Sequence, residues 1–346
     1  MKKILALALV LCLALSLAAC GSSAPAPASS SNTSGGSADS SSEPAASEKT
    51  DTDTVAVGAV IIARDDVNED DIYQFVSTIF ENTAEIAEQH GKGAELDLAF
   101  ASGVTSVPYH PGAARYFAEK GNEVAAVKDG AGTGASAALT FGTGGDTGTY
   151  YGFGSVLANY VSNANSFSVT AVTSGGSKAN IEDMAAGDVQ LGFVQSDVMS
   201  YAYNGERLFD EAITGFSVVA ALYMEQVQIV TTNSSITSVA DLKGKTVSIG
   251  AVGSGVYFNA IDVLQAYGLS ESDIKPVYQS FGDSADSLKD GKIDAAFIVA
   301  GAPTTAITDL AASGNVYLVS IDQSHADSLI AANPFYSTFT IPAGTY

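Results

Sequence analysis

Residues 140–152 read TFGTGGDTGTYYG, and this stretch decides the fold of the chain around it. A short apolar run ends at Phe141, a glycine-rich turn follows, and apolar residues then recur at helical spacing from Tyr151 to Val161. The pattern predicts a strand end, a turn and a helix start. Such a turn lets the backbone approach a ligand and points helical N–H groups at a carboxylate or phosphate. A glycine-rich connection without a ligand is the alternative.

Residues 246–258, TVSIGAVGSGVYF, repeat this design. After each copy the pattern predicts a helix, a strand, a polar loop, a second helix and a third strand. The polar loops are residues 173–177 and 279–284. Parallel α/β halves carry their loops at the carboxyl ends of the strands, where ligands bind. We therefore expect an α/β fold of two lobes, with a hinge and a cleft that closes on a small solute.

The first 20 residues read as a targeting segment. Two lysines precede the apolar run 4–17, which is shorter than the about 20 residues of a membrane-spanning helix. Residues 17–21, LAACG, resemble a bacterial lipobox, which implies cleavage before Cys20 and lipidation of its sulfur. A plain secretory signal is the alternative. Residues 21–53 are rich in Ser, Ala and Pro, a composition typical of a disordered tether.

Composition narrows the class of partner. The formal net charge is -23 and the pI is about 4.2, which disfavours nucleic acid and direct binding to anionic lipid. An anionic ligand must approach this acidic protein, but salt screens remote charges beyond about 8–10 Å, and local N–H groups act at shorter range. A cationic or neutral solute is the alternative. The mature chain would keep only Cys20, so we expect no disulfide.

Motifs for catalysis and metal binding are missing from the sequence. The Gly244-Lys245-Thr246 triplet lacks the earlier glycine of a phosphate-binding P-loop, because Val239 stands there. The three histidines, His90, His110 and His325, are scattered without zinc-ligand spacing. We expect no enzymatic activity, no metal and no cofactor.

Three stretches carry a family resemblance: FGTGGDTGTYYGFGSVLANYV (141–161), ADLKGKTVSIGAVGSG (240–255) and IPAGTY (341–346). They resemble the TAXI family, the solute receptors of TRAP transporters, and the resemblance covers nearly everything after residue 53. It implies a two-lobed, periplasmic-binding-protein-like (type II) fold. It also implies a lipid-anchored extracytoplasmic receptor that delivers a carboxylated solute, glutamate-like or a dicarboxylate, to TRAP membrane subunits. A receptor for a neutral or cationic solute, serving an ABC importer or a sensor, is the alternative.

The order of segments departs from that family. The segment resembling residues 54–121 follows IPAGTY there and precedes the glycine loop here, so the chain looks circularly permuted. We expect Tyr346 to lie beside Thr54. The predicted boundaries are lobe one at 54–226 with a linker at 122–137, lobe two at 227–322, and a return segment at 323–346 that adjoins 54–63. Hinge segments are expected near 225–228 and 54–63, with 321–345 as the alternative to 54–63. Residues 216–222 and 227–231 predict two separate strands.

The candidate ligand residues come from the glycine loops, the polar loops and the strand ends that follow them. Their N–H and hydroxyl groups would bind the solute, and two tyrosines would form walls of the site. For each Ser or Thr, helix capping or turn formation is the alternative. Lys178 is the nearest basic candidate, although a solvated helix position is the favoured interpretation of it. The candidates are Thr143, Gly144, Gly145, Thr149, Tyr150, Ser174, Ser177, Gln195 and Tyr223 from lobe one, and Gly253, Ser254 and Gly255 from lobe two.

Overall fold

The structure is a computed structural model that describes residues 50–346. The predicted targeting segment, the lipidation site Cys20 and most of the predicted tether lie outside the described residues. The sequence predicts a tether up to residue 53, but strand β1 (Thr52–Arg64) already begins at Thr52. The reason is pairing with a distant strand, since Thr52 and Asp53 lie opposite Ile341 and Thr340. No helix between residues 50 and 346 combines the length and apolar character that crossing a membrane requires.

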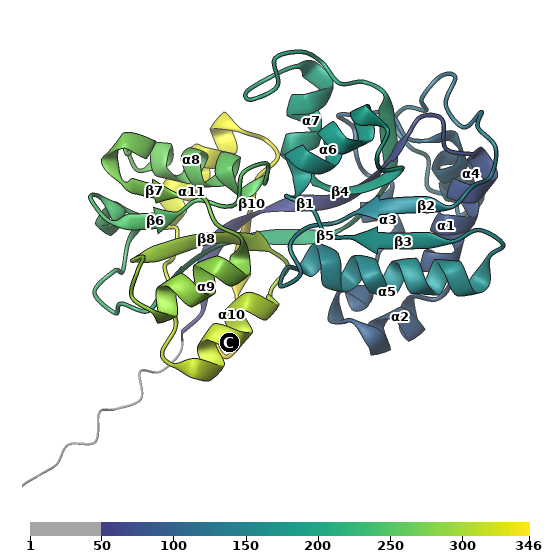
Figure 1. The fold of residues 1–346 in the computed structure, drawn as a ribbon. Coiled ribbons are helices and arrows are strands. Elements are labelled where there is room, and N and C mark those ends of the chain that lie inside the picture. The colour runs from purple at the N-terminus through teal and green to yellow at the C-terminus, as the bar shows by residue number, and fades with distance from the viewer. Residues whose placement is uncertain (1–49) are drawn as a thin grey trace, which may run out of the picture. The chain divides into compact units, whose positions relative to one another are not determined.

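One sheet runs through the described chain in the order β3-β2-β4-β1-β5-β8-β6-β7 (Figure 1). At one end, β2 (Leu139–Gly142) lies between β3 (Val169–Val172) and β4 (Leu191–Gln195), all parallel. At the other end, β6 (Thr246–Ser248) lies between β7 (Lys275–Val277) and β8 (Ala295–Ala300), again parallel. Each glycine loop therefore follows the middle strand of a parallel triplet. The repeated α/β design predicted from the two motifs is confirmed.

Helices surround each triplet and define what we call lobe one and lobe two. Each lobe has a buried apolar core: lobe one's forms one cluster, and lobe two's is split into two clusters. Lobe one contains α1 (Glu69–Glu81), α2 (Thr83–Gln89), η1 (Gly91–Glu95), α3 (Leu98–Ala101), α4 (Pro111–Glu119), α5 (Thr149–Ala164), α6 (Ser177–Ala186) and α7 (Ser196–Asn204). Lobe two contains η2 (Val239–Leu242), α8 (Val256–Ala266), η3 (Glu271–Asp273), α9 (Phe281–Lys289), α10 (Thr305–Ser313) and α11 (Gln323–Ala332).

Two long antiparallel strands, β1 and β5 (Phe216–Thr231), connect the lobes. The start of β1 packs into the core of lobe two, and its second half packs into the core of lobe one. The prediction of separate strands at 216–222 and 227–231 is wrong. The strand is continuous because β1 pairs with it as far as Gln226, where β8 takes over. Residues 223–225 therefore cross between the lobes in extended conformation.

The two ends of the described chain lie beside each other. Strand β10 (Ser337–Ile341) pairs with residues 52–56 of β1, and the Ala343 N–H donates to the Asp51 carboxylate at 2.8 Å. The Tyr346 hydroxyl donates to the Gln228 side chain on β5 and accepts from the Thr304 N–H at 2.9 Å. The short strand β9 (Tyr317–Leu318) pairs with the end of β5. The return of the chain thus completes the sheet beside the crossing strands.

A buried polar network joins the lobes at α7 and α8. The Asn259 amide donates to Asp197 at 3.1 Å and to the Tyr336 hydroxyl at 2.7 Å, and that hydroxyl donates to Asp262 at 3.1 Å. Arg207 pairs with Asp262 at 2.7 Å. Burial, and to a smaller extent the nearby Asp262 carboxylate, raises the pKa of Asp197 to about 7.

Replacing Asp197 tests this network through the pH dependence of stability. The folded pKa of Asp197 lies above its ordinary value of 3.8, so its stabilising contribution is full at low pH and is lost as the pH rises to about 7. In the parent protein, this effect should lower the free energy of unfolding by at most about 1.4 kcal/mol per pH unit. The Asp197→Asn variant should not show this decrease. Urea titrations between pH 4.5 and 8 measure it. The exposed Asp309→Asn is the control, and an unchanged profile for Asp197→Asn would contradict the assignment.

Candidate functional site

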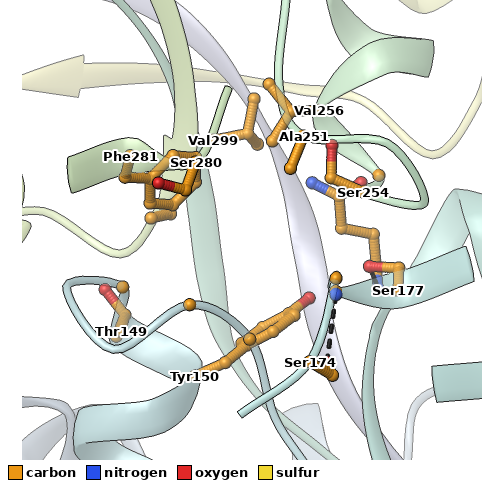
Figure 2. A pocket seen from close by; sticks show the side chains of 18 of the residues that line it. Thr149, Tyr150, Ser174, Ser177, Ala251, Ser254, Val256, Ser280, Phe281 and Val299 are labelled. Carbon is orange, nitrogen blue, oxygen red and sulfur yellow. Dashed lines mark hydrogen bonds between the residues drawn. The ribbon is translucent and has the colours of Figure 1, made fainter. Parts of the chain in front are cut away.

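A cavity lies between the lobes. Its volume is about 580 Å³ when the solvent-open space at its mouth is included. The two glycine loops and the two polar loops all contribute to its lining, and β5 contributes Glu225. Figure 2 shows side chains of both lobes converging on this space, with Tyr150 and Ser177 from lobe one facing Ser254 and Phe281 from lobe two. The cleft expected from the repeated motif is therefore present.

Nine of the twelve candidate residues line the cavity. They are Gly144, Gly145, Thr149, Tyr150, Ser174, Ser177, Gln195, Ser254 and Gly255. Their place on the lining follows from the fold, because Gln195 ends the parallel strand β4 and each of the others lies in a loop or first helical turn after the carboxyl end of a parallel strand. Whether they bind a solute is a question for the proposal below.

The other three candidates lie outside the lining. The Thr143 side chain is buried, and its hydroxyl donates to the Val172 carbonyl at 2.6 Å. Tyr223 is buried among aromatic rings, edge-on to Phe153 at 5.9 Å between ring centroids, so it is no wall of the cavity. The Gly253 carbonyl accepts from the Ala179 N–H at 3.0 Å and so connects the lobes at the cavity's edge. These positions hold the loops in place.

Four helices begin at the cavity. The N-cap residues of α5, α6, α8 and α9 are Gly148, Gly176, Gly255 and Ser280, and all four line it. Ser280 caps α9 by accepting from the Asp283 N–H, but the three glycines have no side chain to cap with. In the first turns of those helices the Ala179 N–H donates to Gly253 and the Phe258 N–H to Gly255, and the first N–H groups keep hydrogen-bonding capacity and partial positive charge on the cavity side. This arrangement suits an anionic group.

Glu225 is the residue that the sequence analysis missed. It lies in the continuous part of β5, is 2% exposed and accepts a hydrogen bond from the Tyr150 hydroxyl at 2.7 Å. Burial raises the pKa of Glu225 to about 8, although the Tyr150 hydrogen bond opposes this. Most of this carboxyl is thus protonated at pH 7. The sequence does contain a feature that could have identified it: Glu225 is the one charged residue among the sixteen residues of β5.

The rest of the lining is uncharged. No Lys, Arg or His is among the described residues that line the cavity. Lys178 does not line the cavity; it pairs with Glu182 one turn along α6 and lies over the Phe209 ring at 5.4 Å, with a side chain that is 20% exposed. The apolar part of the lining comes from lobe two, with Val256, Phe281 and Val299 among its side chains. Within residues 50–346, no group of His, Cys, Asp and Glu could hold a metal ion.

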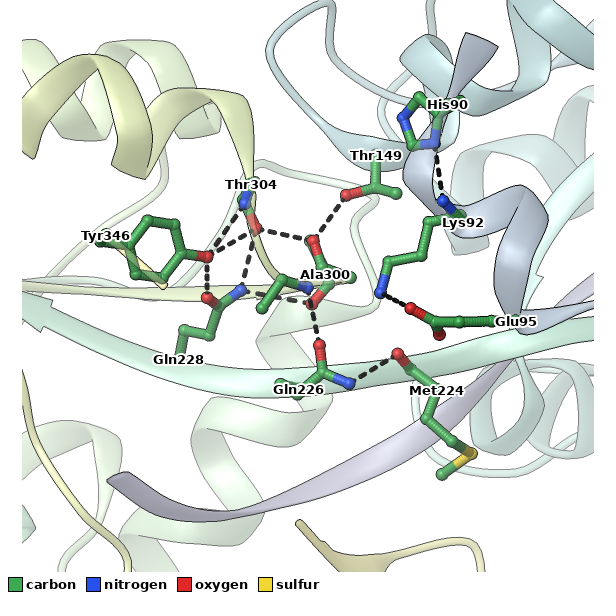
Figure 3. A network of polar contacts seen from close by, with 12 residues as sticks. His90, Lys92, Glu95, Thr149, Met224, Gln226, Gln228, Ala300, Thr304 and Tyr346 are labelled. Atoms are coloured by element: carbon green, nitrogen blue, oxygen red, sulfur yellow. Dashed lines mark hydrogen bonds and ion pairs between the residues drawn. The ribbon is translucent and has the colours of Figure 1, made fainter. Parts of the chain in front are cut away.

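The lobes touch on both sides of the cavity. On one side Ala179 donates to Gly253, as described above. On the other, the Thr149 hydroxyl donates to the Gly301 carbonyl at 3.0 Å, and the Ala306 N–H donates to the Thr147 carbonyl at 3.3 Å. Figure 3 shows the Thr149 contact beside the network of Gln228, Thr304 and Tyr346. The two lobes are therefore closed on the cavity.

Several solved solute-binding proteins are similar to part of this chain. The alkanesulfonate-binding protein SsuA from Xanthomonas axonopodis pv. citri, bound to MOPS, is 21% identical over 53% of this chain and 60% of that chain, with a TM-score of 0.37. The aliphatic sulphonate binding protein SsuA from Escherichia coli is 20% identical over 54% and 60%, with a TM-score of 0.34. An ancestral arginine-binding protein bound to arginine is 17% identical over 57% and 90%, with a TM-score of 0.36.

These similarities say nothing about the ligand of the present chain, which spans 60% of the length of either sulfonate-binding protein. A sequence model of the NMT1-like family, in contrast, matches residues 43–121 and 141–346. That match includes both glycine loops, both crossing strands and the return segment. The chain belongs to the NMT1-like family.

Proposed function

We propose that this protein is an extracytoplasmic solute-binding receptor that captures a small carboxylated solute between its lobes and delivers it to a membrane permease. The observation that carries the proposal is the interlobe cavity at which three uncapped helices begin. Their N–H groups would bind the carboxylate, with help from the Ser174 and Ser177 hydroxyls. The apolar lining from lobe two would contact the carbon skeleton.

Closure follows from the hinge. The lobes are connected through β1 and β5, and they also meet through hydrogen bonds at the edges of the cavity and through the buried network between α7 and α8. A solute bound to both glycine loops would add its own contacts to these bonds and favour the closed state. The surface that the receptor presents to its permease would then differ between the solute-bound and the empty protein.

The permease we propose is of the TRAP type, on the strength of the resemblance to TAXI receptors. The same resemblance implies the circular permutation. In the family, the IPAGTY segment continues directly into the segment that resembles residues 54–121, so the permutation requires residues 341–346 to lie close to residue 54 in this chain. The pairing of residues 337–341 with residues 52–56 supports this requirement. We further propose that the receptor is lipid-anchored through Cys20 and acts without catalysing a reaction.

One observation favours the rival receptor for a neutral or cationic solute, serving an ABC importer or a sensor. Glu225 is the ionisable carboxyl in the lining, and no basic side chain among the described lining residues balances it. A simple anion would be bound only by neutral donors, the backbone N–H groups and serine hydroxyls. A permease of the TRAP type encoded beside this gene would favour the first proposal over the rival.

A thermal-shift screen of amino acids, dicarboxylates and polyamines tests the receptor function. A carboxylated solute present at 100 times its dissociation constant should raise the free energy of unfolding by about 2.7 kcal/mol. A shift with polyamines alone would contradict the carboxylate, and the absence of any shift across the panel would contradict the receptor.

The Gly255→Ala variant tests the cavity directly. A Cβ at Gly255 would collide with the Gln195 amide and lie 3.0 Å from the Ser177 hydroxyl, so Gln195 must move. The flexible amide can yield at little cost in stability. We expect at least about tenfold weaker solute binding, equal to about 1.4 kcal/mol, with nearly unchanged unfolding in urea. Gly91→Ala, where a Cβ meets open space, is the control; full affinity in Gly255→Ala would place the solute elsewhere.

The Cys20→Ser variant tests the anchor. Without the thiol no lipid can be attached, so the protein should move from the membrane fraction to the soluble extracytoplasmic fraction of cells. Fractionation and immunoblotting measure this. Equal membrane association of the variant and the parent would contradict lipidation at Cys20.

A further inference from the structure

We propose that Glu225 is the specificity-determining residue of the interlobe cavity and that it accepts an ammonium group. The solute is then of the amino-acid type, with a carboxylate at the helix starts and an ammonium at Glu225, and not a dicarboxylate that lacks an amino group. This inference rests on the proposed receptor function and names its substrate class.

The position of Glu225 makes it a ligand group. It lines the cavity from the crossing strand β5, and the Tyr150 hydroxyl is the hydrogen-bond partner recorded for its side chain among the described residues. A carboxyl this deeply buried costs free energy unless a partner compensates for it. Tyr150 is a neutral donor and satisfies one carboxylate oxygen. The other oxygen needs a donor that the solute can supply.

Two further buried atoms lack partners. Gln195 Oε1 and Ser254 Oγ both belong to lining residues, and neither has a hydrogen-bond partner among the described residues. Gln195 is 2% exposed and Ser254 is 9% exposed. Both atoms can accept, and an ammonium carries three N–H donors. The cavity therefore offers two kinds of group: backbone N–H donors at the helix starts, and side-chain acceptors that need a donor.

A dicarboxylate fits this division poorly. Its second carboxylate carries no N–H donor for these acceptors, and Glu225 could lie beside it only in the protonated form, because two carboxylates in a buried site repel each other. No lining Lys, Arg or His among the described residues offsets that repulsion. A zwitterion instead satisfies both kinds of group with no net charge brought into the cavity.

The charged groups around Glu225 set the proton balance of binding. The Tyr150 hydroxyl of α5 donates a hydrogen bond to Glu225. The charges of Asp197 in α7 and Lys92 in η1 also act on its pKa. Lys92 is itself paired with Glu95, as Figure 3 shows, and lies 5.3 Å from the centre of the Tyr223 ring. Glu95 therefore offsets part of the positive charge of Lys92, and burial keeps the pKa of Glu225 at about 8.

Binding of an ammonium consequently releases one proton. The Glu225 carboxyl gives up its proton to solvent, and the resulting carboxylate accepts N–H bonds from the ammonium. Affinity should therefore rise with pH, by up to about tenfold per pH unit below 8, and level off above it.

The test compares each of the twenty standard L-amino acids with its des-amino acid, such as L-glutamate with glutarate, by isothermal calorimetry from pH 5.5 to 8.5. We expect at least one amino acid to bind more than about tenfold tighter than its des-amino acid. We also expect release of one proton, measured in two buffers of different ionisation enthalpy.

Two variants separate the role of Glu225 from a general effect on the cavity. Glu225→Gln keeps the shape and should weaken amino-acid binding by about 10–100-fold, abolish its pH dependence and spare the des-amino acid. Tyr150→Phe removes the hydrogen bond that lowers the pKa of Glu225. The pH above which the affinity stops rising should therefore be higher in this variant. The exposed Glu211→Gln is the control.

The outcomes separate this inference from the receptor function. If des-amino acids bind as tightly, or affinity falls as the pH rises because a protonated Glu225 donates to the solute, the inference is wrong and the receptor proposal stands. An unchanged pH profile in Glu225→Gln would also overturn it. If no amino acid and no des-amino acid binds, both proposals fail.

Discussion

The antiparallel pairing of β1 with β5 is the interaction on which the other features depend. Both strands cross between the lobes, so each contributes to two apolar cores. The pairing fixes how the two parallel triplets face each other, and through them where the four helices begin. It also carries Glu225 to the cavity. A change in its register by one residue would turn that side chain to the opposite face of the sheet.

The cavity holds groups that are unfavourable in an empty protein. Three helices begin at glycine without a side-chain cap, where Ser, Thr, Asp or Asn would stabilise the helix by a further few tenths of a kcal/mol each, roughly. A buried carboxyl and unpartnered acceptors add to the cost. By contrast, α1 is capped by the Asn68 side chain, and α9, which also begins at the cavity, is capped by Ser280. Local conflict of this kind is typical of a binding site, where the solute supplies the missing partners.

Sequence reasoning located most of the cavity because its residues follow local rules. Gly144, Ser174 and Gly255 lie in turns after strands, and a turn between a strand and a helix can be recognised within about ten residues of sequence. The same reasoning misplaced Thr143 and Tyr223. Both are close in sequence to lining residues, but their side chains point into the lobe, where backbone carbonyls and aromatic rings receive them.

The sequence by itself determined the repeated α/β halves, the glycine loops and the acidic, histidine-poor composition, since these are properties of short segments. Tertiary structure alone decided that residues 216–231 form one strand. Their hydrogen-bond partners are 56–64 and 296–300, far away in the chain, and no local pattern reveals them. The same long-range pairing places an isolated glutamate of an apolar run in the lining of the cavity. Local propensity chooses the elements, whereas distant pairing chooses which side chains meet.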